Sequence, residues 1–248
     1  MADKAWFKDW FSSPYYFLLY KNHNDREAFS FIHKLIEHLK PQPNSKMLDI
    51  ACGKGRHSKV LAEMGFDVTG IDMSLPSIEE ALQSEQENLH FYQHDMRLPF
   101  WINYFDYTFN FFTSFGYFRT KREHDDAIRT IAQSLRPGGI FVIDYLNVRY
   151  AEASMEKSTE KVVEGVVFHI TKWQDDDHFF KQIQVREPNS IIFKHLNTEK
   201  VAKFSLGDFT DMLAYQNMQV QEVYGDYQFS RYDVQKSPRM IIVAKKAQ

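Results

Sequence analysis

The sequence MLDIACGKGRHS, residues 47–58, decides the fold of this chain. Its apolar start predicts a strand, its two glycines predict a tight turn, and Val60, Leu61 and Met64 then recur at helical spacing. A strand, a glycine turn and a helix in this order begin the nucleotide-binding type of α/β domain. The glycines let the backbone approach a ligand closely, and the free N–H groups at the helix start point toward it.

The composition is that of one globular chain with a sizeable core. The 248 residues are 44% hydrophobic and 16% aromatic, so we expect one large domain with a subsidiary insert. A net charge of −3 and a pI of about 6.4 favour neither a polyanion binder nor an acidic tail. Cys52 is the only cysteine, which excludes an internal disulfide and a Cys-x-x-Cys zinc site and suits a reducing compartment.

The sequence also predicts where the protein works. Asp3, Lys4, Lys8 and Asp9 interrupt the first ten residues, so these do not form the apolar core of a signal peptide. No stretch reaches the roughly 18 apolar residues that a membrane-spanning helix needs. We therefore expect a cytoplasmic protein that has no membrane partner.

Strand and helix patterns alternate after the glycine turn. The expected strands are residues 66–71, 89–93, 105–112 and 140–144. Gly65 suits the left-handed end of the first helix, and Ser74 suits the cap of the second, with Pro76 tolerated in its first turn. Such alternation is typical of a parallel sheet with right-handed crossovers.

The pattern changes after the fifth strand. Residues 161–204 contain β-branched or alternating runs at 162–173, 179–185 and 191–195, separated by turn residues. These runs predict an antiparallel β insert. We therefore expect an α/β fold with a doubly wound, Rossmann-like, mostly parallel sheet of about seven strands and an antiparallel β insert after the fifth strand.

The last part of the chain returns to the main sheet. Ser205 and Asp208 have the spacing of a capping box at the start of a helix, and residues 220–224 and 240–244 are apolar enough to be strands. At the other end of the chain, an aromatic lead precedes a helical pattern that begins near Asp25. The aromatic residues of this lead are Trp6, Phe7, Trp10, Phe11, Tyr15, Tyr16, Phe17 and Tyr20.

Polar residues stand where the expected parallel strands end. Ligands of such sheets bind beyond the carboxyl ends of the strands. Asp72 ends the second strand and lies 72 − 53 = 19 positions after Gly53, close to the roughly 20 positions expected of a ribose-binding acid. Asp95 follows the third strand, and Asp144 and Asn147 follow the fifth. The sequence thus predicts a ligand site at this edge of the sheet.

Asp49 stands four residues before Gly53, in the setting Leu-Asp-Ile-Ala-Cys-Gly-Lys-Gly. This stretch resembles the first motif of the class I S-adenosylmethionine-dependent methyltransferases, although Ala51 stands where many members have glycine. The resemblance extends over residues 46–147 and, more loosely, over the last two strands. It implies that the methionine end of the cofactor lies at Asp49, the ribose at Asp72 and the adenine at the acid after the third strand.

The resemblance also implies a set of cofactor-binding residues and a division of the chain. The set is Asp49, Ala51, Gly53, Gly55, Arg56, Asp72, Met73, Asp95, Met96 and Phe112. Residues 1–45 would form an N-terminal helical cap, and residues 46–150 with 205–248 would bind S-adenosylmethionine and leave S-adenosylhomocysteine as product. Residues 151–204 would be the β insert, as a substrate lid or a dimerisation surface that makes a homodimer.

The reaction expected from this resemblance is methyl transfer to nitrogen or oxygen of a small organic acceptor. The aromatic residues of the lead and the insert suit a pocket for such a molecule. The sequence does not identify a general base, and the candidates by position are Tyr16, Tyr20, Asp144 and Asn147. The histidines lack His-x-x-x-His spacing, so we expect no metal site.

Other functions stay open at this point. A protein methyltransferase whose insert grips a partner and a cofactor-binding protein without turnover both fit the sequence. An NAD-dependent oxidoreductase is a remote alternative, because Ser58 replaces the third glycine of the dinucleotide motif, although Tyr117 and Lys121 have the spacing of short-chain dehydrogenases. A nucleic-acid partner is disfavoured, because no Asn-Pro-Pro-Tyr motif and no basic cluster is present.

Overall fold

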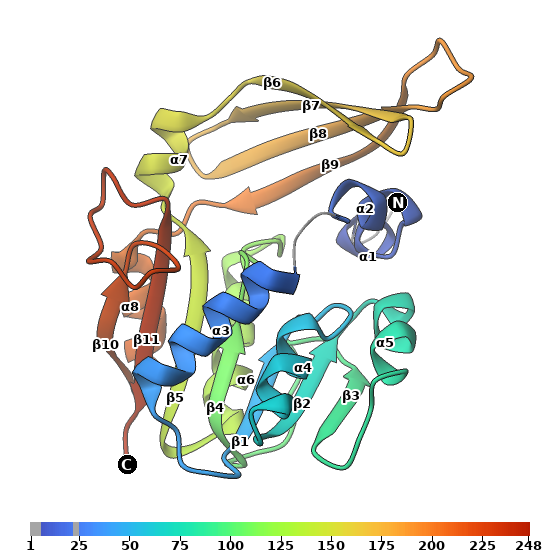
Figure 1. Cartoon of the computed structure of the whole chain (residues 1–248). Coiled ribbons are helices and arrows are strands. Elements are labelled where there is room, and N and C mark those ends of the chain that lie inside the picture. The colour runs from blue at the N-terminus through green and yellow to red at the C-terminus, as the bar shows by residue number, and fades with distance from the viewer. Residues whose placement is uncertain (1–5, 22–24) are drawn as a thin grey trace.

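A seven-stranded sheet forms the centre of the computed structural model, which describes residues 6–21 and 25–248 (Figure 1). Residues 1–5 and 22–24 of the predicted cap lie outside the described residues. The strands of the sheet are β1 (Lys46–Ile50), β2 (Asp67–Asp72), β3 (Leu89–Gln93), β4 (Phe105–Asn110), β5 (Leu135–Leu146), β10 (Met218–Tyr224) and β11 (Arg239–Lys246).

The strand order is β10-β11-β5-β4-β1-β2-β3, and β11 is the strand that runs antiparallel to both of its neighbours. All other pairings in this sheet are parallel. The predicted doubly wound, Rossmann-like fold is thereby confirmed. Among the helices that the structure describes, none is both long enough and apolar enough to cross a membrane.

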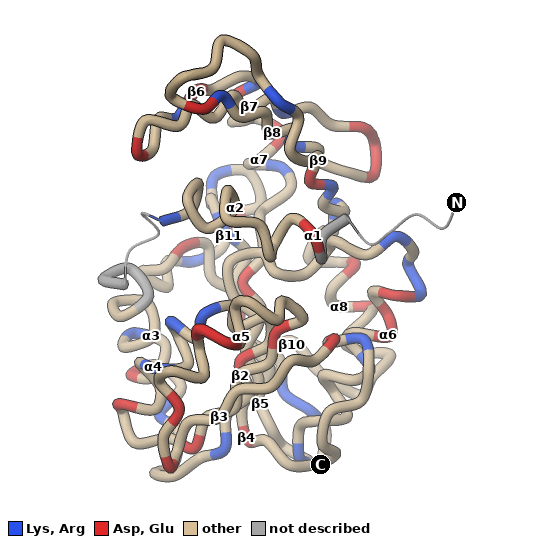
Figure 2. Tube along the Cα trace, turned by 90° about the vertical axis from the view of Figure 1, so that its right-hand side faces the viewer, with Lys and Arg blue, Asp and Glu red and all other residues tan. Residues whose placement is uncertain are grey.

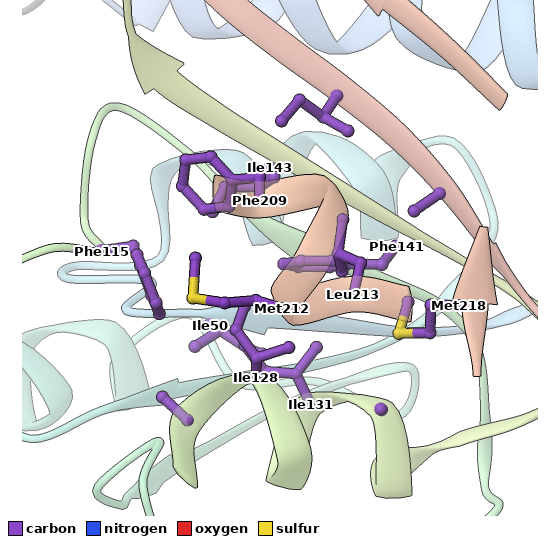
Figure 3. Packing of buried hydrophobic residues seen from close by; sticks show 14 of the residues in the cluster. Ile50, Phe115, Ile128, Ile131, Phe141, Ile143, Phe209, Met212, Leu213 and Met218 are labelled. Atoms are coloured by element: carbon purple, nitrogen blue, oxygen red, sulfur yellow. The ribbon is translucent and has the colours of Figure 1, made fainter. Parts of the chain in front are cut away.

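Helices cover both faces of the sheet because side chains of each strand alternate between two apolar layers. Along β11, Ile241 and Val243 join the layer of α3 (Asp25–Leu39), α4 (Arg56–Glu63) and α5 (Leu75–Leu82). Met240 and Ile242 join the opposite layer, under α6 (Lys121–Ser134) and α8 (Leu206–Ala214). Figure 3 shows this second layer, where Phe209, Met212 and Leu213 of α8 face residues of α6 and the sheet.

The helix ends follow the predicted signals. Gly65 has φ +91° just after α4, and the Ser74 side chain caps α5 with proline in the first turn. Ser205 and Asp208 form the predicted capping box of α8. The sequence analysis did not identify the capping box of Thr120 and Glu123, which starts α6.

Two strands differ from their predicted bounds. Strand β4 ends at Asn110 rather than at residue 112, because Phe112 has φ +56° and Thr113 has φ +57°, and this left-handed backbone turns the chain out of the extended conformation. Strand β5 begins at Leu135 rather than at residue 140, because Leu135 pairs with Phe105 ahead of a register shift.

The insert is a separate four-stranded antiparallel sheet in the order β6-β7-β8-β9. After the unpredicted helix α7 (Val148–Ser154) come β6 (Ser158–Val163), β7 (Val166–Gln174), β8 (His178–Arg186) and β9 (Lys194–Ala202). The predicted run at residues 162–173 is divided into two strands, since Glu164 and Gly165 take positive φ and make a hairpin turn. The predicted run at 191–195 starts late, with Ile191 94% exposed.

The predicted N-terminal cap consists of two different parts. Helices α1 (Trp6–Phe11) and α2 (Pro14–Leu19) lie between the insert and the main sheet in both views (Figures 1 and 2). Trp10 and Leu19 pack there against Phe168 and Ile183 of the insert. Helix α3, in contrast, packs beside α4 on the main sheet. Lys, Arg, Asp and Glu are interspersed over the molecule (Figure 2).

One packing constraint holds the glycine turn on the sheet. Phe91 of β3 is paired with Gly70 of β2, and a Cβ on Gly70 would lie 2.6 Å from the Phe91 ring and 2.9 Å from the Cys52 sulfur. A Cβ on Gly55 would lie 2.5 Å from the same ring. The buried phenyl ring therefore occupies the space that two missing side chains leave.

We predict that Gly70→Ala lowers the free energy of unfolding by about 1–3 kcal/mol, the usual effect of overpacking a core. Adding Phe91→Leu to this variant should recover part of the loss, since leucine lacks the ring atom Cε1, which lies 2.8 Å from a Cβ at residue 70. Urea unfolding of the wild type, both single variants and the double variant measures the effect. Strictly additive losses would show that the two residues do not share this space.

Candidate functional site

A pocket lies at the carboxyl ends of the parallel strands, where α1 and α2 cover them. The pocket space, part of which is open to solvent, is about 830 Å³. The described residues that line it come from α1, α2 and the segments after β1, β2, β3 and β4. They are Phe11, Tyr16, Ala51, Gly53, Ile71, Asp72, Met73, Ser74, Ser77, His94, Asp95, Met96, Phe112, Thr113, Ser114, Tyr117 and Phe118.

The turn after β1 has the backbone that a close ligand contact needs. Ala51 has φ +58° and Gly53 has φ +56°, and such left-handed backbone at a non-glycine residue such as Ala51 is strained. A Cβ placed on Gly53 would meet no atom within 4 Å, so the turn opens into the pocket. Gly55 instead faces Phe91 and precedes α4, so its role in this structure is packing.

Asp72 at the end of β2 fixes this turn. One oxygen of its carboxylate accepts the Gly53 N–H at 2.9 Å, and the other accepts the Ser74 N–H at 2.8 Å. Burial raises the pKa of Asp72, while these backbone N–H groups oppose the rise. Each carboxylate oxygen can accept a further hydrogen bond, so the side chain can bind two ligand hydroxyls from the pocket while it holds the turn.

Asp49 lies behind the turn and outside the pocket lining. Its carboxyl group is 1% exposed and accepts a hydrogen bond of 2.6 Å from the Ser58 hydroxyl. Burial raises the pKa of Asp49 to about 7, although the Ser58 hydrogen bond and the charge of Arg56 lower it. An acid in this position changes its charge near neutral pH.

Asp95 is held at the far end of the pocket by Arg97. The guanidinium contacts both carboxylate oxygens of Asp95, with the shortest N–O distance 2.6 Å, and also binds Glu123 of α6 at 2.6 Å. Its carbon lies 5.0 Å from the centre of the Phe118 ring. This bidentate contact orients Asp95 and Phe118 together at the pocket wall.

The segment after β4 is held in its left-handed conformation from the opposite side. The Phe112 N–H donates to Asp144 at 2.9 Å, and Arg239 of β11 donates to Asp144 at 2.7 Å and to the Thr113 hydroxyl at 2.8 Å. Tyr227 also donates to Asp144 at 2.9 Å. These bonds support the two backbone positions that aim Phe112 and Thr113 at the pocket.

His57 supports the same wall from the start of α4. Its ring stacks on Phe112 with ring centres 5.2 Å apart and an angle of 27° between the planes. Burial and the neighbouring Arg56 lower the pKa of His57 to about 3, so the imidazole is neutral at physiological pH. Its Nε2 has no hydrogen-bond partner among the described residues. The guanidinium carbon of Arg56 also lies over Phe112, 5.1 Å from the centre of its ring.

Aromatic rings from the cap form the remaining wall. Phe11 packs edge-to-face on Tyr16, at 5.1 Å between ring centres, and on Tyr117, at 5.3 Å. Lys54 of the glycine turn lies 4.2 Å from the ring centre of Phe17 in α2, which attaches the cap to the turn. The cap thus presents ring faces and phenol groups to the space beside the strand ends.

The structure brings together seven of the predicted cofactor residues at the pocket: Ala51, Gly53, Asp72, Met73, Asp95, Met96 and Phe112. Asp49, Gly55 and Arg56 are not among the lining residues. The sequence analysis did not assign several residues of the lining, among them Phe11, Tyr117 and Phe118. Phe11 belongs to the aromatic lead, which the sequence analysis had assigned to the cap. Tyr117 was noted only for its dehydrogenase-like spacing from Lys121, and Lys121 is exposed at the start of α6.

The four candidates for proton transfer lie in different surroundings. Tyr16 lines the pocket, and Tyr20 lies one ring behind it, with ring centres 4.8 Å apart. Asp144 is fully buried and accepts the three side-chain and backbone bonds described above. Asn147 donates to the carbonyl groups of Asp233, Val234 and Ser237, which favours a structural role in holding that loop.

Two acids, Asp72 and Asp95, line the pocket. Among the residues that the structure describes, no three His, Cys, Asp or Glu side chains gather closely enough to hold a metal ion. Asp72 and Asp95 face the pocket from the ends of neighbouring strands, each already oriented by nitrogen donors of the chain. Such acids bind hydroxyl and amino groups of a ligand.

Comparison with known proteins gives one family. Residues 41–184 match the family model described as a methyltransferase domain. The Bacillus subtilis protein YqeM, which is named as a methyltransferase, is 36% identical over 114 residues, 45% of this chain and 46% of that protein. The dTDP-3-amino-3,4,6-trideoxy-alpha-D-glucopyranose N,N-dimethyltransferase of Streptomyces venezuelae is 30% identical over 100 residues, 40% of this chain and 42% of that protein.

The chain thus spans about half the length of the curated relatives it matches. Among solved structures, the CcbJ methyltransferase of Streptomyces caelestis is similar over 97% of this chain and 99% of that one, with a TM-score of 0.79 and 16% identity. At 16% identity this similarity shows the fold alone.

We predict that Asp49 makes the stability of the protein depend on pH between about 4 and 7. In this window the unfolded chain has an ionised Asp49, from an ordinary pKa of 3.8, while the folded chain keeps the proton up to a pKa of about 7. Stability from this group therefore falls as pH rises, by up to about 4 kcal/mol at roughly 1.4 kcal/mol per pKa unit.

Asp49→Asn is neutral at every pH and lacks this component. The free energy of unfolding of the variant, minus that of the wild type, should rise from pH 4 to pH 7 and stay level above pH 7. Urea unfolding of both proteins across this range measures the difference. A difference that does not change with pH would mean that Asp49 is ionised in the folded protein throughout.

Proposed function

The chain belongs to the class I S-adenosylmethionine-dependent methyltransferases, and on this basis we propose that it transfers a methyl group from S-adenosylmethionine to nitrogen or oxygen of a small organic acceptor. The observation that carries the proposal is the pocket at the strand ends, where Asp72, Asp95 and the open turn at Gly53 face one space. That space is covered by the aromatic residues of the cap.

The residues present fit the cofactor. Asp72 has lone pairs left for the two ribose hydroxyls, and Asp95 with Met96 lies one strand further along, as an adenine would require. The space beside Gly53 is open, and the resemblance gives the methionine end to this turn, behind which Asp49 lies buried. When bound, S-adenosylmethionine supplies an electrophilic methyl group on a sulfonium.

The chain's own contribution is to orient the reacting groups and keep water out. Phe112 and Thr113 are fixed by Asp144 and Arg239, so the wall on the sheet side is rigid. Tyr16 and Phe11 cover the other side from the cap. Holding an acceptor in line with the methyl group in this way makes the reaction effectively unimolecular.

A small acceptor is the form of the proposal that the relatives support. The Streptomyces venezuelae relative is named for an amino-sugar nucleotide. The β insert would select the acceptor indirectly, because none of the described lining residues comes from β6 to β9, whereas the cap helices that line the pocket pack on it. We further propose that the β insert is a dimerisation surface through which the chain forms a homodimer.

The proposal predicts a specific loss in Asp72→Ala. This variant should raise the dissociation constant for S-adenosylmethionine by about 10- to 100-fold, or about 1.5–3 kcal/mol, the range for hydrogen bonds to a charged group. Asp67→Ala is the matched control, because Asp67 begins the same strand at the end opposite the pocket. Calorimetry measures binding, and circular dichroism shows whether both variants are folded.

Turnover is tested with the same three proteins. The wild type and Asp67→Ala should release S-adenosylhomocysteine when supplied with S-adenosylmethionine and the low-mass fraction of a cell extract, and Asp72→Ala should do so only at higher cofactor concentration. Release with the polypeptide fraction alone would favour a protein methyltransferase. Unchanged cofactor binding in Asp72→Ala would mean that the ribose is placed wrongly.

A further inference from the structure

A buried carboxylate beneath the insert has no part in the cofactor site. Glu199 of β9 is 7% exposed and lies on the inner face of the insert, on the side that packs against the cap. It accepts hydrogen bonds from Trp10 of α1 at 2.8 Å and from Tyr20 just after α2 at 3.3 Å, and Lys181 of β8 lies 3.4 Å from its second oxygen. Burial of a charge is costly and needs such partners.

The carboxylate lies close to the cap wall of the pocket. Tyr20 contacts Glu199 and packs on Tyr16, which lines the pocket. Phe11 then connects Tyr16 to Tyr117 on the other side of the same wall. Burial raises the pKa of both Tyr16 and Tyr117, and the Glu199 charge raises both further, so its field reaches the two phenols.

These phenols are poor proton acceptors, because a tyrosine with a raised pKa keeps its proton at neutral pH. A hydroxyl acceptor must lose a proton during attack. The lining around Tyr16 and Tyr117 offers phenyl rings, phenols and the hydroxyls of Thr113 and Ser114, whereas Asp72, His94 and Asp95 line the part of the pocket that the proposal gives to the adenosine. A neutral amine needs no base at that moment. The cap wall therefore suits an amine better than an alcohol.

We infer that the acceptor is an amine, and that Glu199 with the faces of Tyr16 and Tyr117 stabilises the ammonium that forms on it; this inference rests on the proposed function. The amine lone pair forms the new N–C bond, and the C–S bond breaks with its electron pair left on sulfur. The positive charge thus moves from the sulfonium to the nitrogen beside the cap, and the ammonium proton passes to water after release. A buried carboxylate and aromatic faces favour this shift of charge.

Lys181 weakens the stabilisation of the ammonium by Glu199, because it neutralises part of the Glu199 charge. Its own pKa is lowered by burial, while Glu199 opposes that change. Lys172 faces Lys181 directly across β7 and β8, so Glu199 is the acidic member of the cross-strand row Lys172, Lys181 and Glu199. Without Glu199 the field at the cap wall becomes positive and opposes an ammonium.

Sinefungin tests the inference without a known acceptor. This analogue of S-adenosylmethionine carries an ammonium group in place of the sulfonium methyl, so its charge lies on the acceptor side. Glu199→Gln should weaken sinefungin binding by about 10-fold, as expected for the loss of one partly buried charge interaction, and leave the dissociation constant for S-adenosylhomocysteine within about 2-fold. Glu199→Asp, which keeps the charge, should restore part of the sinefungin affinity.

Glu187→Gln is the matched control, because Glu187 is also an insert carboxylate that accepts a hydrogen bond from a tyrosine of α2, Tyr15, but it is exposed. It should change neither dissociation constant. Lys181→Met should tighten sinefungin binding relative to S-adenosylhomocysteine, because the Glu199 charge is then less neutralised. If Glu199→Gln does not fold, this comparison tests the inference in its place. Equal changes for both ligands in the Glu199 and Lys181 variants would overturn the inference, whereas a wild type that binds neither ligand would overturn the proposed function itself.

Discussion

The hydrogen bond from the Gly53 N–H to the Asp72 carboxylate, 2.9 Å long, is the interaction on which the rest of the site depends. Parallel strands end with backbone N–H groups that have no partner in the sheet, and each needs an acceptor once the chain turns away. Asp72 supplies it for the turn after β1, and Asp144 does the same for Phe112 after β4. Carboxylates at strand ends thus fix strained turns and shape the pocket together.

The main sheet and the pocket residues that follow its strands were predictable from sequence, because both depend on local patterns. Apolar runs marked β1 to β5, and the acids after them had to meet at one sheet edge. The cap half was not predictable in the same way. The positions of Tyr117 and Phe118 depend on Phe11 and Arg97, and the network of Asp144 depends on Arg239, which lies 95 residues later in the chain.

The insert shows a second limit of sequence patterns. Alternation indicated the insert, but the run predicted at 191–195 covers only the start of β9. Glu199 lies beyond that run, among side chains that point inward, where an apolar residue is the ordinary choice. Only the packed structure shows that Trp10, Tyr20 and Lys181 surround this acid. The proposed cofactor side of the pocket therefore lies on the main sheet, and the proposed acceptor side lies toward the cap, which packs on the insert.

The most direct measurement of this account is a calorimetric titration of the purified chain with S-adenosylhomocysteine and, separately, with NADH. Both ligands contain an adenosine with ribose hydroxyls, but only the first has the amino-acid end that the turn at Gly53 and Asp49 is expected to accept. The account predicts saturable binding of S-adenosylhomocysteine and no binding of NADH. Binding of NADH without binding of S-adenosylhomocysteine would contradict it.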